Sequence, residues 1–456
     1  MSENYDVIVV GAGPAGEVAA GRLADAGVKV AIVEQHLVGG ECSFYACMPS
    51  KGLLRPDELL GEAKRVPGVR EAVTGGLDVQ VVLDRRDEII HDADDSAQLP
   101  WLEDRGIALV RGHGVLTGER EVTVGDEVLT AAQAVIIGTG TKAAIPPIDG
   151  LREAEPWTNR EATTAKHVPK SLLVLGGGVS GVELAQAFAS LGAQVTLVEA
   201  NDRLISREEG FACHDVLEAL RGDGVDVQLG CRPAAVARDG DGVTVKLEDG
   251  REFRAEEVLC ALGRQVLTED LGLETVGLEP GKPIEVDDRM RVPGHDWLYV
   301  VGDANGRAPL THVGKYQARV AADDILGRGR TVNPLADGLH VPRVIFTNPQ
   351  VAAVGHTEAS AAAAGVRVRC VEAPTSATAG ASFVGKDTAG TCKLVIDEQR
   401  DVIIGATFTG FEVAEWLHAA TIAIVGEVPL KTLYHATPSF PTRSETWLKL
   451  LEAAEG

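Results

Sequence analysis

The chain lacks any apolar run approaching the ~20 residues that a membrane-spanning helix needs, and it lacks an excess of positive charge. Its 43 Lys and Arg residues are outnumbered by 67 Asp and Glu residues, which gives a formal net charge of −24. Nucleic acid and anionic membrane surfaces are therefore poor partners. The N-terminus also lacks a basic region followed by a leader-like apolar stretch and a cleavage site, so we expect a cytoplasmic protein.

Cysteine is sparse and mostly scattered. The seven cysteines include one close pair, Cys42 and Cys47, and their odd number does not suit a secreted disulfide framework. In a reducing compartment such a pair is more often catalytic or metal-binding than structural. Besides this pair, the first 100 residues offer only His36 and His91 as Cys or His ligands, so we predict no metal site. Two unreactive buried cysteines remain the alternative.

Two segments repeat one supersecondary pattern, from Tyr5 to Glu34 and from Ser171 to Glu199. Each reads as an apolar strand, a glycine turn, an amphipathic helix and a second apolar strand that ends in Glu. Continuous apolar strands around a helix predict a parallel sheet that is covered on both faces. The 456 residues, at roughly 150 per domain, suggest about three domains.

Both repeats place a GxGxxG motif between strand and helix, which predicts two dinucleotide sites. The first glycine permits a tight turn, the second lets the backbone approach a pyrophosphate, and the third lets helix and strand pack closely. Glu34 and Glu199 can accept hydrogen bonds from ribose hydroxyls. A carboxylate at position 199 favours NADH over NADPH, although Arg203 could soften that preference. The motif glycines are Gly11, Gly13, Gly16, Gly176, Gly178 and Gly181.

The spacing of the cysteine pair constrains its geometry. Residues five apart in a regular helix have Cα atoms roughly 8–9 Å apart, whereas a disulfide needs less than about 7 Å. If Cys42 and Cys47 form a bond, part of the segment must leave helical geometry. A thiol near a helix N-terminus and close to Lys51 would be a better nucleophile.

These motifs resemble the flavin-dependent pyridine nucleotide-disulfide oxidoreductases. The resemblance covers essentially the whole chain and rests on Gly-Gly-x-Cys-x4-Cys-x-Pro-Ser-Lys, which ends at Lys51, and on Leu298-Tyr-Val-Val-Gly-Asp303. It implies an α/β fold with two Rossmann-like dinucleotide-binding domains, for FAD and NAD, and an α+β C-terminal dimerisation domain. The expected parts are residues 1–149 and 270–336 for FAD, 150–269 for NAD(P), and 337–456 for dimerisation.

The resemblance also assigns roles to individual residues. Cys47 would face the flavin and form the charge-transfer complex, while Cys42 would meet the substrate. Lys51 and Glu183 match the family's ion pair near flavin N5, and Asp303 matches the aspartate that binds the ribityl chain of FAD. The resemblance further implies cofactor contacts from Lys51 and from Ala15, Gly40, Gly114, Thr139, Gly140, Gly263, Leu310 and Thr311.

The C-terminal run departs from this pattern. Glutathione reductase and dihydrolipoamide dehydrogenase end with His-Pro-Thr-x-x-Glu, in which the histidine is the acid/base and the glutamate orients it. This chain keeps Glu445 but carries Phe440 in place of the histidine. Phenylalanine cannot transfer a proton, and losing a positioned base typically costs about 10²–10⁴-fold in rate. His435 is the candidate replacement, with an ordinary surface histidine as the alternative.

We therefore predict a homodimeric oxidoreductase with FAD and NADH as cofactors, NADPH being possible. Electrons would pass from NADH through FAD to a Cys42–Cys47 disulfide, and then to a small-molecule disulfide or another acceptor. One alternative is an NAD(P)H-dependent reductase of quinones, oxygen or metal ions that uses the flavin directly. A second alternative is a redox-sensing FAD protein without turnover.

Overall fold

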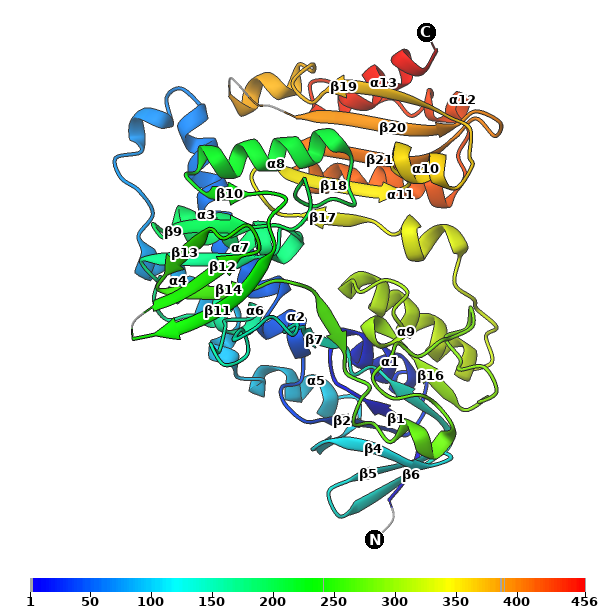
Figure 1. Cartoon of the computed structure of the whole chain (residues 1–456). Coiled ribbons are helices and arrows are strands. Elements are labelled where there is room, and N and C mark those ends of the chain that lie inside the picture. The colour runs from blue at the N-terminus through cyan, green and yellow to red at the C-terminus, as the bar shows by residue number, and fades with distance from the viewer. Residues whose placement is uncertain (1–2, 241, 386–387, 389, 456) are drawn as a thin grey trace. The chain divides into compact units, whose positions relative to one another are not determined.

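The computed structural model describes residues 3–240, 242–385, 388 and 390–455. The chain divides into two compact units, which Figure 1 traces from blue to red. The first unit contains residues 1–49, 87–143 and 264–338, and the second contains residues 50–86, 144–263 and 339–456. Each unit is therefore assembled from three separate stretches of sequence.

The first unit is built on a seven-stranded sheet with strand order β3-β2-β1-β6-β5-β4, in which β16 also pairs with β6. β1, β2, β3, β6 and β16 pair in parallel, whereas β4 and β5 return to β6 as antiparallel strands. The alternating, turn-rich sequence of residues 112–137 predicts a β-meander, and the antiparallel strands β4, β5 and β6 confirm it. The strands are β1 (Glu3–Val10), β2 (Val30–Glu34), β3 (Ala108–Arg111), β4 (Gly114–Gly118), β5 (Glu121–Val124), β6 (Glu127–Ile137) and β16 (Leu298–Val300).

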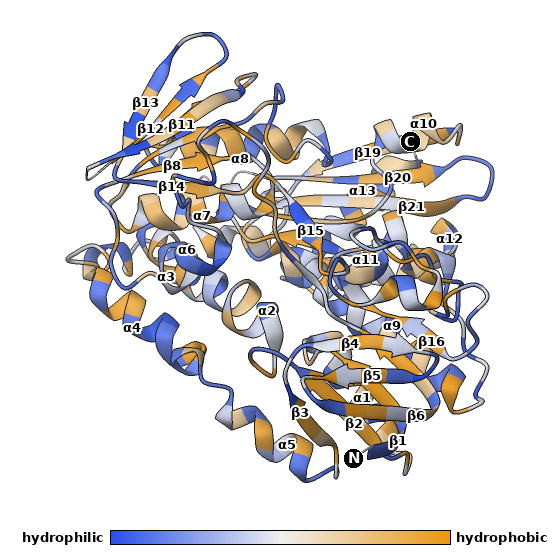
Figure 2. Cartoon of the chain, turned by 60° about the horizontal axis from the view of Figure 1, so that its bottom comes forward, coloured by the Kyte–Doolittle hydropathy of each residue, from blue (hydrophilic) through white to orange (hydrophobic). Residues whose placement is uncertain are grey.

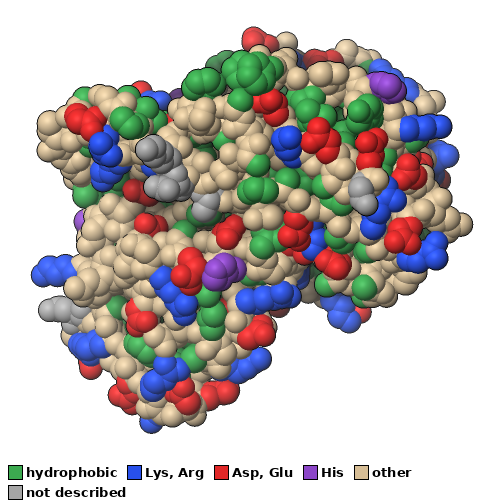
Figure 3. All heavy atoms as spheres, turned by 90° about the horizontal axis from the view of Figure 1, so that it is seen from above, with side chains coloured by type: hydrophobic (Ala, Val, Ile, Leu, Met, Phe, Trp, Pro, Cys, Tyr) green, Lys and Arg blue, Asp and Glu red, His purple; other side chains and the backbone are tan. Residues whose placement is uncertain are grey.

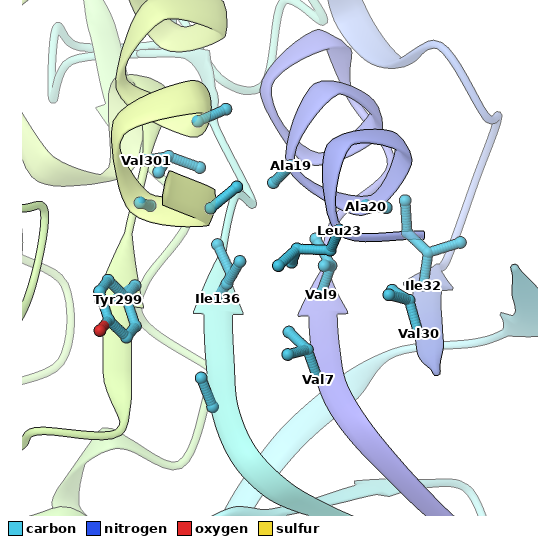
Figure 4. Packing of buried hydrophobic residues seen from close by; sticks show 14 of the residues in the cluster. Val7, Val9, Ala19, Ala20, Leu23, Val30, Ile32, Ile136, Tyr299 and Val301 are labelled. Atoms are coloured by element: carbon cyan, nitrogen blue, oxygen red, sulfur yellow. The ribbon is translucent and has the colours of Figure 1, made fainter. Parts of the chain in front are cut away.

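Helices α1 (Pro14–Ala24) and α9 (Thr311–Ile325) pack against one face of this sheet. Figure 4 shows Ala19 and Leu23 of α1 above the strand residues Val9 and Ile136. The two helices meet closely, because a Cβ added at Gly314 would lie 3.3 Å from the Cβ of Ala15. Apolar strands need such cover, and Figure 2 shows β2 and the second half of β1 in orange.

Short elements complete the first unit. Helix α2 (Gly40–Phe44) ends before α3 (Cys47–Arg65), whose first residues belong to this unit. A small antiparallel pair joins β7 (Thr141–Ala143) to β15 (Arg264–Val266). The remaining short helices are η2 (His91–Ala93), η3 (Ser96–Gln98), α5 (Leu99–Glu103), η4 (Leu273–Val276), η5 (Gly302–Asn305) and η6 (Pro334–Ala336).

The second unit contains the other predicted strand–turn–helix repeat. Its parallel sheet has the order β10-β9-β8-β14, and a three-stranded antiparallel sheet has the order β11-β12-β13. The strands are β8 (Ser171–Leu175), β9 (Gln194–Val198), β10 (Asp226–Gln228), β11 (Pro233–Asp239), β12 (Gly242–Leu247), β13 (Glu252–Ala255) and β14 (Glu257–Cys260). The helices are α6 (Asn159–Thr164), α7 (Val179–Ser190) and α8 (Gly210–Gly222).

The C-terminal part of the second unit is a five-stranded antiparallel sheet with the order β17-β18-β21-β20-β19. The sequence patterns at 392–396 and 403–408 predict strands, and β20 and β21 confirm both predictions. Its strands are β17 (Arg343–Ile345), β18 (Gln350–Gly355), β19 (Val368–Pro374), β20 (Thr391–Asp397) and β21 (Val402–Gly410). Its helices are η7 (Gly338–His340), α10 (Glu358–Ala363), η8 (Gly380–Val384), η9 (Val413–Trp416), α11 (Leu417–Val425), α12 (Leu430–Leu433), η10 (Arg443–Glu445) and α13 (Thr446–Glu455).

The charged sequence of residues 55–110 predicts helix, but only parts of this stretch are helical. Helix α3 ends at Arg65, η1 spans Arg70–Ala72, and α4 spans Val79–Ile89. The stretch ends in β3, whose pairing with β2 was not expected from its sequence. A four-residue strand is too short to show a period of its own, so tertiary pairing decides its conformation.

Two surface findings bear on partners. Among the described residues, no helix combines the length and apolar character needed to cross a bilayer. On the face drawn in Figure 3, acidic and basic side chains are interspersed. The negative charge of the chain is therefore not gathered into a single patch on that face.

A buried carboxylate ties α1 to the end of α9. Asp323 is completely buried, and Arg22 of α1 donates to both of its oxygens, at 2.8 and 2.9 Å. Arg328 and Arg330 also contact it, at 2.9 and 3.1 Å. Burial would raise the pKa of Asp323, but the hydrogen bonds and charges of these guanidinium groups outweigh it and lower that pKa.

We expect Asp323→Asn to lower the free energy of unfolding at pH 7 by about 2–3 kcal/mol, because it removes charge-assisted hydrogen bonds from a buried group. A carboxyl group whose pKa is lower in the folded state stabilises the fold at pH values above its pKa in the unfolded state. This stabilisation is lost as the pH falls through the pKa of the folded state. The difference between variant and wild type should therefore shrink below about pH 4. Urea unfolding of both proteins at several pH values measures this difference in the free energy of unfolding.

The matched control is Glu279→Gln, which removes one partner of an exposed pair with Lys282 (2.7 Å; side chains 69% and 64% exposed). Exposed pairs contribute less than about 1 kcal/mol. Equal losses of stability in the two variants would contradict the role assigned to Asp323.

Candidate active site

The first GxGxxG turn is shaped by close backbone contacts. Gly11 has φ +103°, and a Cβ there would lie 2.5 Å from the carbonyl oxygen of Gly138. A Cβ at Gly16 would lie 1.9 Å from the carbonyl oxygen of Gly11. Gly13, by contrast, has no atom within 4 Å of the position that a Cβ would take. The N-terminus of α1 therefore faces open space where a phosphate can approach the backbone.

Glu34 is held at the end of β2 by two backbone donors. The amide of Ala12 donates to Oε2 at 2.8 Å, and the amide of His36 donates to Oε1 at 2.7 Å. Each oxygen keeps capacity for a further donor. The carboxylate is thus fixed beside the glycine turn, as a ribose hydroxyl requires.

The second turn reproduces this geometry. Gly176 has φ +107°, a Cβ at Gly181 would lie 1.9 Å from the carbonyl oxygen of Gly176, and Gly178 has open space around it. Glu199 accepts from the amide of Gly177 at 2.6 Å and from the amide of Asn201 at 2.7 Å. Both turns therefore have the open glycine and the anchored carboxylate that a dinucleotide site requires.

Asp303 belongs to a network that the sequence did not reveal. Thr141 donates its hydroxyl to Asp303 at 2.6 Å, and Arg264 donates from Nε to that same hydroxyl oxygen at 2.7 Å. Arg264 also lies 3.6 Å from Glu41. Thr141 directly follows Thr139 and Gly140, which are predicted cofactor contacts. This adjacency was the signal in the sequence that could have identified Thr141.

The other predicted cofactor residues of the first unit have varied surroundings. Thr139 donates its hydroxyl to the carbonyl of Leu267 at 2.8 Å. Gly40, at φ +61°, has its Cβ position 2.8 Å from the Cα of Gly13. Gly114 is buried under valine side chains of neighbouring strands, so packing alone accounts for it. Positive φ values also occur at Gly140 and, in the second unit, at Gly263.

The cysteine pair lies where a helix is interrupted. Cys42 belongs to α2, which ends at Phe44, and Cys47 is the first residue of α3. Between them Tyr45 leaves helical geometry, with φ −131° and ψ −4°. The interruption that a Cys42–Cys47 bond requires is therefore present. In the structure both residues are thiols.

The two thiols interact with each other and with α9. The Cys42 thiol hydrogen-bonds to Cys47, and this bond is the largest cause that raises the pKa of Cys42 well above its ordinary value. Burial and the charge of Cys47 add to the rise, whereas Thr311 and Lys315 oppose it. Thr311 Oγ1 lies 3.5 Å from Cys47 Sγ. The two thiols are therefore coupled, and loss of a proton belongs to the pair rather than to either cysteine alone.

Lys51 and Glu183 form an ion pair within the second unit. Lys51 Nζ donates to Glu183 Oε2 at 2.7 Å, and the backbone amide of Phe346 donates to Oε1 at 2.9 Å. Lys51 Nζ also lies 4.8 Å from the centre of the Phe346 ring. Glu183 is only 3% exposed, so its charge depends on these partners.

The C-terminal candidate residues have the following surroundings. His435 is exposed, with its ring against Tyr434 at 5.8 Å. Phe440 is 76% exposed. Glu445 has a buried Oε2 without a hydrogen-bond partner among the described residues. Within the part of the chain that the structure describes, no group of three or more His, Cys, Asp or Glu could hold a metal ion.

A two-dinucleotide architecture with a thiol pair between helices defines a flavoprotein of the disulfide oxidoreductase class. The chain matches the family described as pyridine nucleotide-disulphide oxidoreductase over residues 5–318, and that family's dimerisation domain over residues 341–451. The chain therefore belongs to the pyridine nucleotide-disulphide oxidoreductases, which bind FAD and use NAD(P)H. The predicted fold class and cofactors are confirmed at this level.

Individual relatives resemble nearly the whole chain. The mercuric reductase of Staphylococcus aureus is 30% identical over 448 residues, covering 97% of this chain and 81% of the relative. The dihydrolipoyl dehydrogenase of Haloferax volcanii is 31% identical over 471 residues, covering 100% and 97%. A Cu(II) complex of the HOCl-induced flavoprotein disulfide reductase RclA of Escherichia coli matches with a TM-score of 0.86 at 25% identity, covering 99% of both chains.

The two open glycines allow the cofactor sites to be tested separately. We expect Gly13→Ala to reduce FAD content and Gly178→Ala to raise the Kd for NADH, because the new methyl group would meet only the bound dinucleotide. An inserted methyl group in a tight contact costs about 1–3 kcal/mol, or roughly tenfold or more in Kd. Absorbance of the purified protein and NADH titration measure the two effects.

Each variant is the control for the other. Gly178→Ala should keep its FAD, and both variants should retain the circular dichroism of the wild type because neither backbone has positive φ. Full FAD content in Gly13→Ala, or loss of FAD in Gly178→Ala, would contradict the assignment of the two sites.

Proposed function

We propose that this protein is an NADH-dependent disulfide oxidoreductase that uses Cys42 and Cys47 as its redox-active pair. The observation that carries the proposal is the hydrogen-bonded pair of thiols at the interruption between α2 and α3, with Thr311 beside it. Bound FAD would supply two-electron transfer between the nicotinamide and the sulfur atoms. A small-molecule disulfide is the proposed acceptor class.

The chain's residues would have distinct tasks. The glycine turns and the carboxylates of Glu34 and Glu199 would bind and orient the two dinucleotides. Reduction of the disulfide by two electrons and one proton breaks the S–S bond and leaves one thiol and one thiolate. Cys47, which the family resemblance places against the flavin, would be the thiolate, and Cys42 would be the thiol.

Glu199 supports the choice of NADH. Its carboxylate is fixed beside the second turn by Gly177 and Asn201, and a negative charge there disfavours the 2′-phosphate of NADPH. Lys51 and Glu183 are proposed to act as the ion pair near the flavin, as their 2.7 Å contact permits. The match to a dimerisation domain supports a homodimer.

Phe440 favours a second candidate function. The absence of a histidine at this position leaves disulfide exchange without the acid/base of the well-known reductases, so an acceptor that needs no proton relay is also compatible. The mercuric reductase relative and the Cu(II) complex of RclA make thiophilic metal ions one such class. Quinones or oxygen, reduced directly by the flavin, are another.

An anaerobic titration with NADH and then dithionite tests the leading proposal. The wild type should take up four electrons per subunit, two for the flavin and two for the disulfide, and develop a long-wavelength thiolate-to-flavin band at the two-electron stage. Cys47→Ser should take up only two electrons and lack the band. Absorbance spectra recorded at each addition give both results.

Cys370→Ser is the matched control, because Cys370 lies on β19 within the other unit. It should behave as the wild type. Uptake of only two electrons by the wild type would refute the disulfide proposal. NADH–quinone activity retained in Cys42→Ser would then favour direct reduction by the flavin.

A further inference from the structure

The backbone that carries Asp303 is held from inside the first unit. The family resemblance assigns this aspartate to the ribityl chain of FAD, and it lies in the short helix η5. Gln317 is completely buried, and its Oε1 accepts from the amide of Gly302 at 2.8 Å and from Nδ2 of Asn305 at 2.9 Å. Both ends of η5 are therefore fixed, and the direction of the Asp303 carboxylate depends on the contacts of its own side chain.

The hydroxyl of Thr141 contacts that carboxylate. Thr141 is 8% exposed in β7 and donates to Asp303 Oδ2 at 2.6 Å. A hydroxyl group has one hydrogen to donate, and an ionised carboxylate only accepts, so this hydrogen is committed to Asp303. The two carboxylate oxygens offer about four acceptor positions, which leaves Asp303 able to accept from a ribityl hydroxyl as well.

Arg264 holds Thr141 by two hydrogen bonds. Its Nε donates to the hydroxyl oxygen at 2.7 Å, and its Nη2 donates to the backbone carbonyl of the same residue at 2.8 Å. A guanidinium group has donors only, so it occupies a lone pair of the hydroxyl oxygen and leaves the hydrogen for Asp303. Because carbonyl and hydroxyl are held together, the side chain of Thr141 is also fixed about χ1, a torsion that is already stiff in β-branched residues.

Strand pairing and an opposite charge keep Arg264 in this place. β15, which begins with Arg264, is the antiparallel neighbour of β7, and Val266 lies opposite Thr141 in their register. The guanidinium lies 3.6 Å from Glu41, and both side chains are partly buried. A charge that is partly removed from water is costly unless it is paired, so Glu41 stabilises Arg264 beside Thr141.

We infer that Thr141 and Arg264 are positioning residues of the FAD site. Arg264 orients the Thr141 hydroxyl, and that hydroxyl orients Asp303 toward the ribityl chain. A carboxylate that is already fixed loses less conformational freedom when the cofactor binds, so the two residues raise the affinity for FAD through Asp303. The inference depends on the assignment of Asp303 to the ribityl chain and on no step of the proposed disulfide chemistry.

The test is the Kd for FAD, obtained from the flavin fluorescence that is released on serial dilution of the holoprotein. Thr141→Val keeps the shape of the side chain but removes the hydroxyl, and it should raise the Kd by about tenfold because a charge-assisted hydrogen bond is lost. Thr141→Ser keeps the hydroxyl and should bind FAD as the wild type does. An unchanged Kd in Thr141→Val, or an equal rise in Thr141→Ser, overturns the inference.

A double-mutant cycle shows whether the effect passes through the carboxylate. Asp303→Ala should itself raise the Kd for FAD, and adding Thr141→Val to it should cause no further rise, because no carboxylate is left to orient. Additive effects of the two substitutions would contradict the inference. Should Thr141→Val not fold, Arg264→Met removes the guanidinium and allows the same comparison with Asp303→Ala.

Thr268→Val is the matched control for the loss of a buried hydroxyl. Thr268 is completely buried in the same unit, and its hydroxyl donates to the carbonyl of Lys282 at 2.8 Å. This variant should keep the Kd of the wild type. A rise equal to that of Thr141→Val would mean a general loosening of the unit and would overturn the inference.

Failure of the inference can be told apart from failure of the proposed function. If Asp303→Ala binds FAD as tightly as the wild type, Asp303 does not hold the cofactor and the inference fails with that assignment. The dilution experiment involves no electron transfer, so its result leaves the Cys42–Cys47 chemistry untouched. Electron uptake in the anaerobic titration decides that chemistry separately.

Discussion

The architecture depends on the close approach of backbone to backbone in the two glycine turns. At Gly16 and Gly181 a side chain would lie 1.9 Å from a carbonyl oxygen, so the helix could not begin where it does with any larger residue. This contact directs each helix N-terminus to the carboxyl end of its sheet, where a dinucleotide can bind. It also brings the carboxylates of Glu34 and Glu199 beside the turns, each anchored by two backbone amides.

Acidic side chains of the first unit that are buried or partly buried are paired with arginine side chains. Asp323 is enclosed by three guanidinium groups, and Glu41 lies beside Arg264. The chain carries 67 acidic residues against 43 basic ones, and such pairing keeps these buried carboxylates from remaining as uncompensated charges.

The structural features that could be predicted from the sequence are those determined by residues close together in the chain. The strand–turn–helix repeats, the meander and the helix interruption between Cys42 and Cys47 all follow from short-range spacing. Thr141 and the Arg22–Asp323 contact were missed because their partners lie far away in the chain. Strand β3 was missed for the same reason, since only its pairing with β2 identifies it. The exposure of the His435 side chain likewise could not be predicted from its separation in sequence from Phe440.

Because the first unit is assembled from three separate stretches of sequence, it is completed late during synthesis. Arg22 and its partner Asp323 are separated by 301 residues, so at about 5–20 residues per second the ribosome needs roughly 15–60 s to make the second after the first. During that interval α1 has no α9 to pack against, and the sheet β10-β9-β8-β14 of the second unit is completed first. A nascent chain must therefore keep the apolar strands β1 and β2 protected from aggregation until the last segment of their own unit emerges.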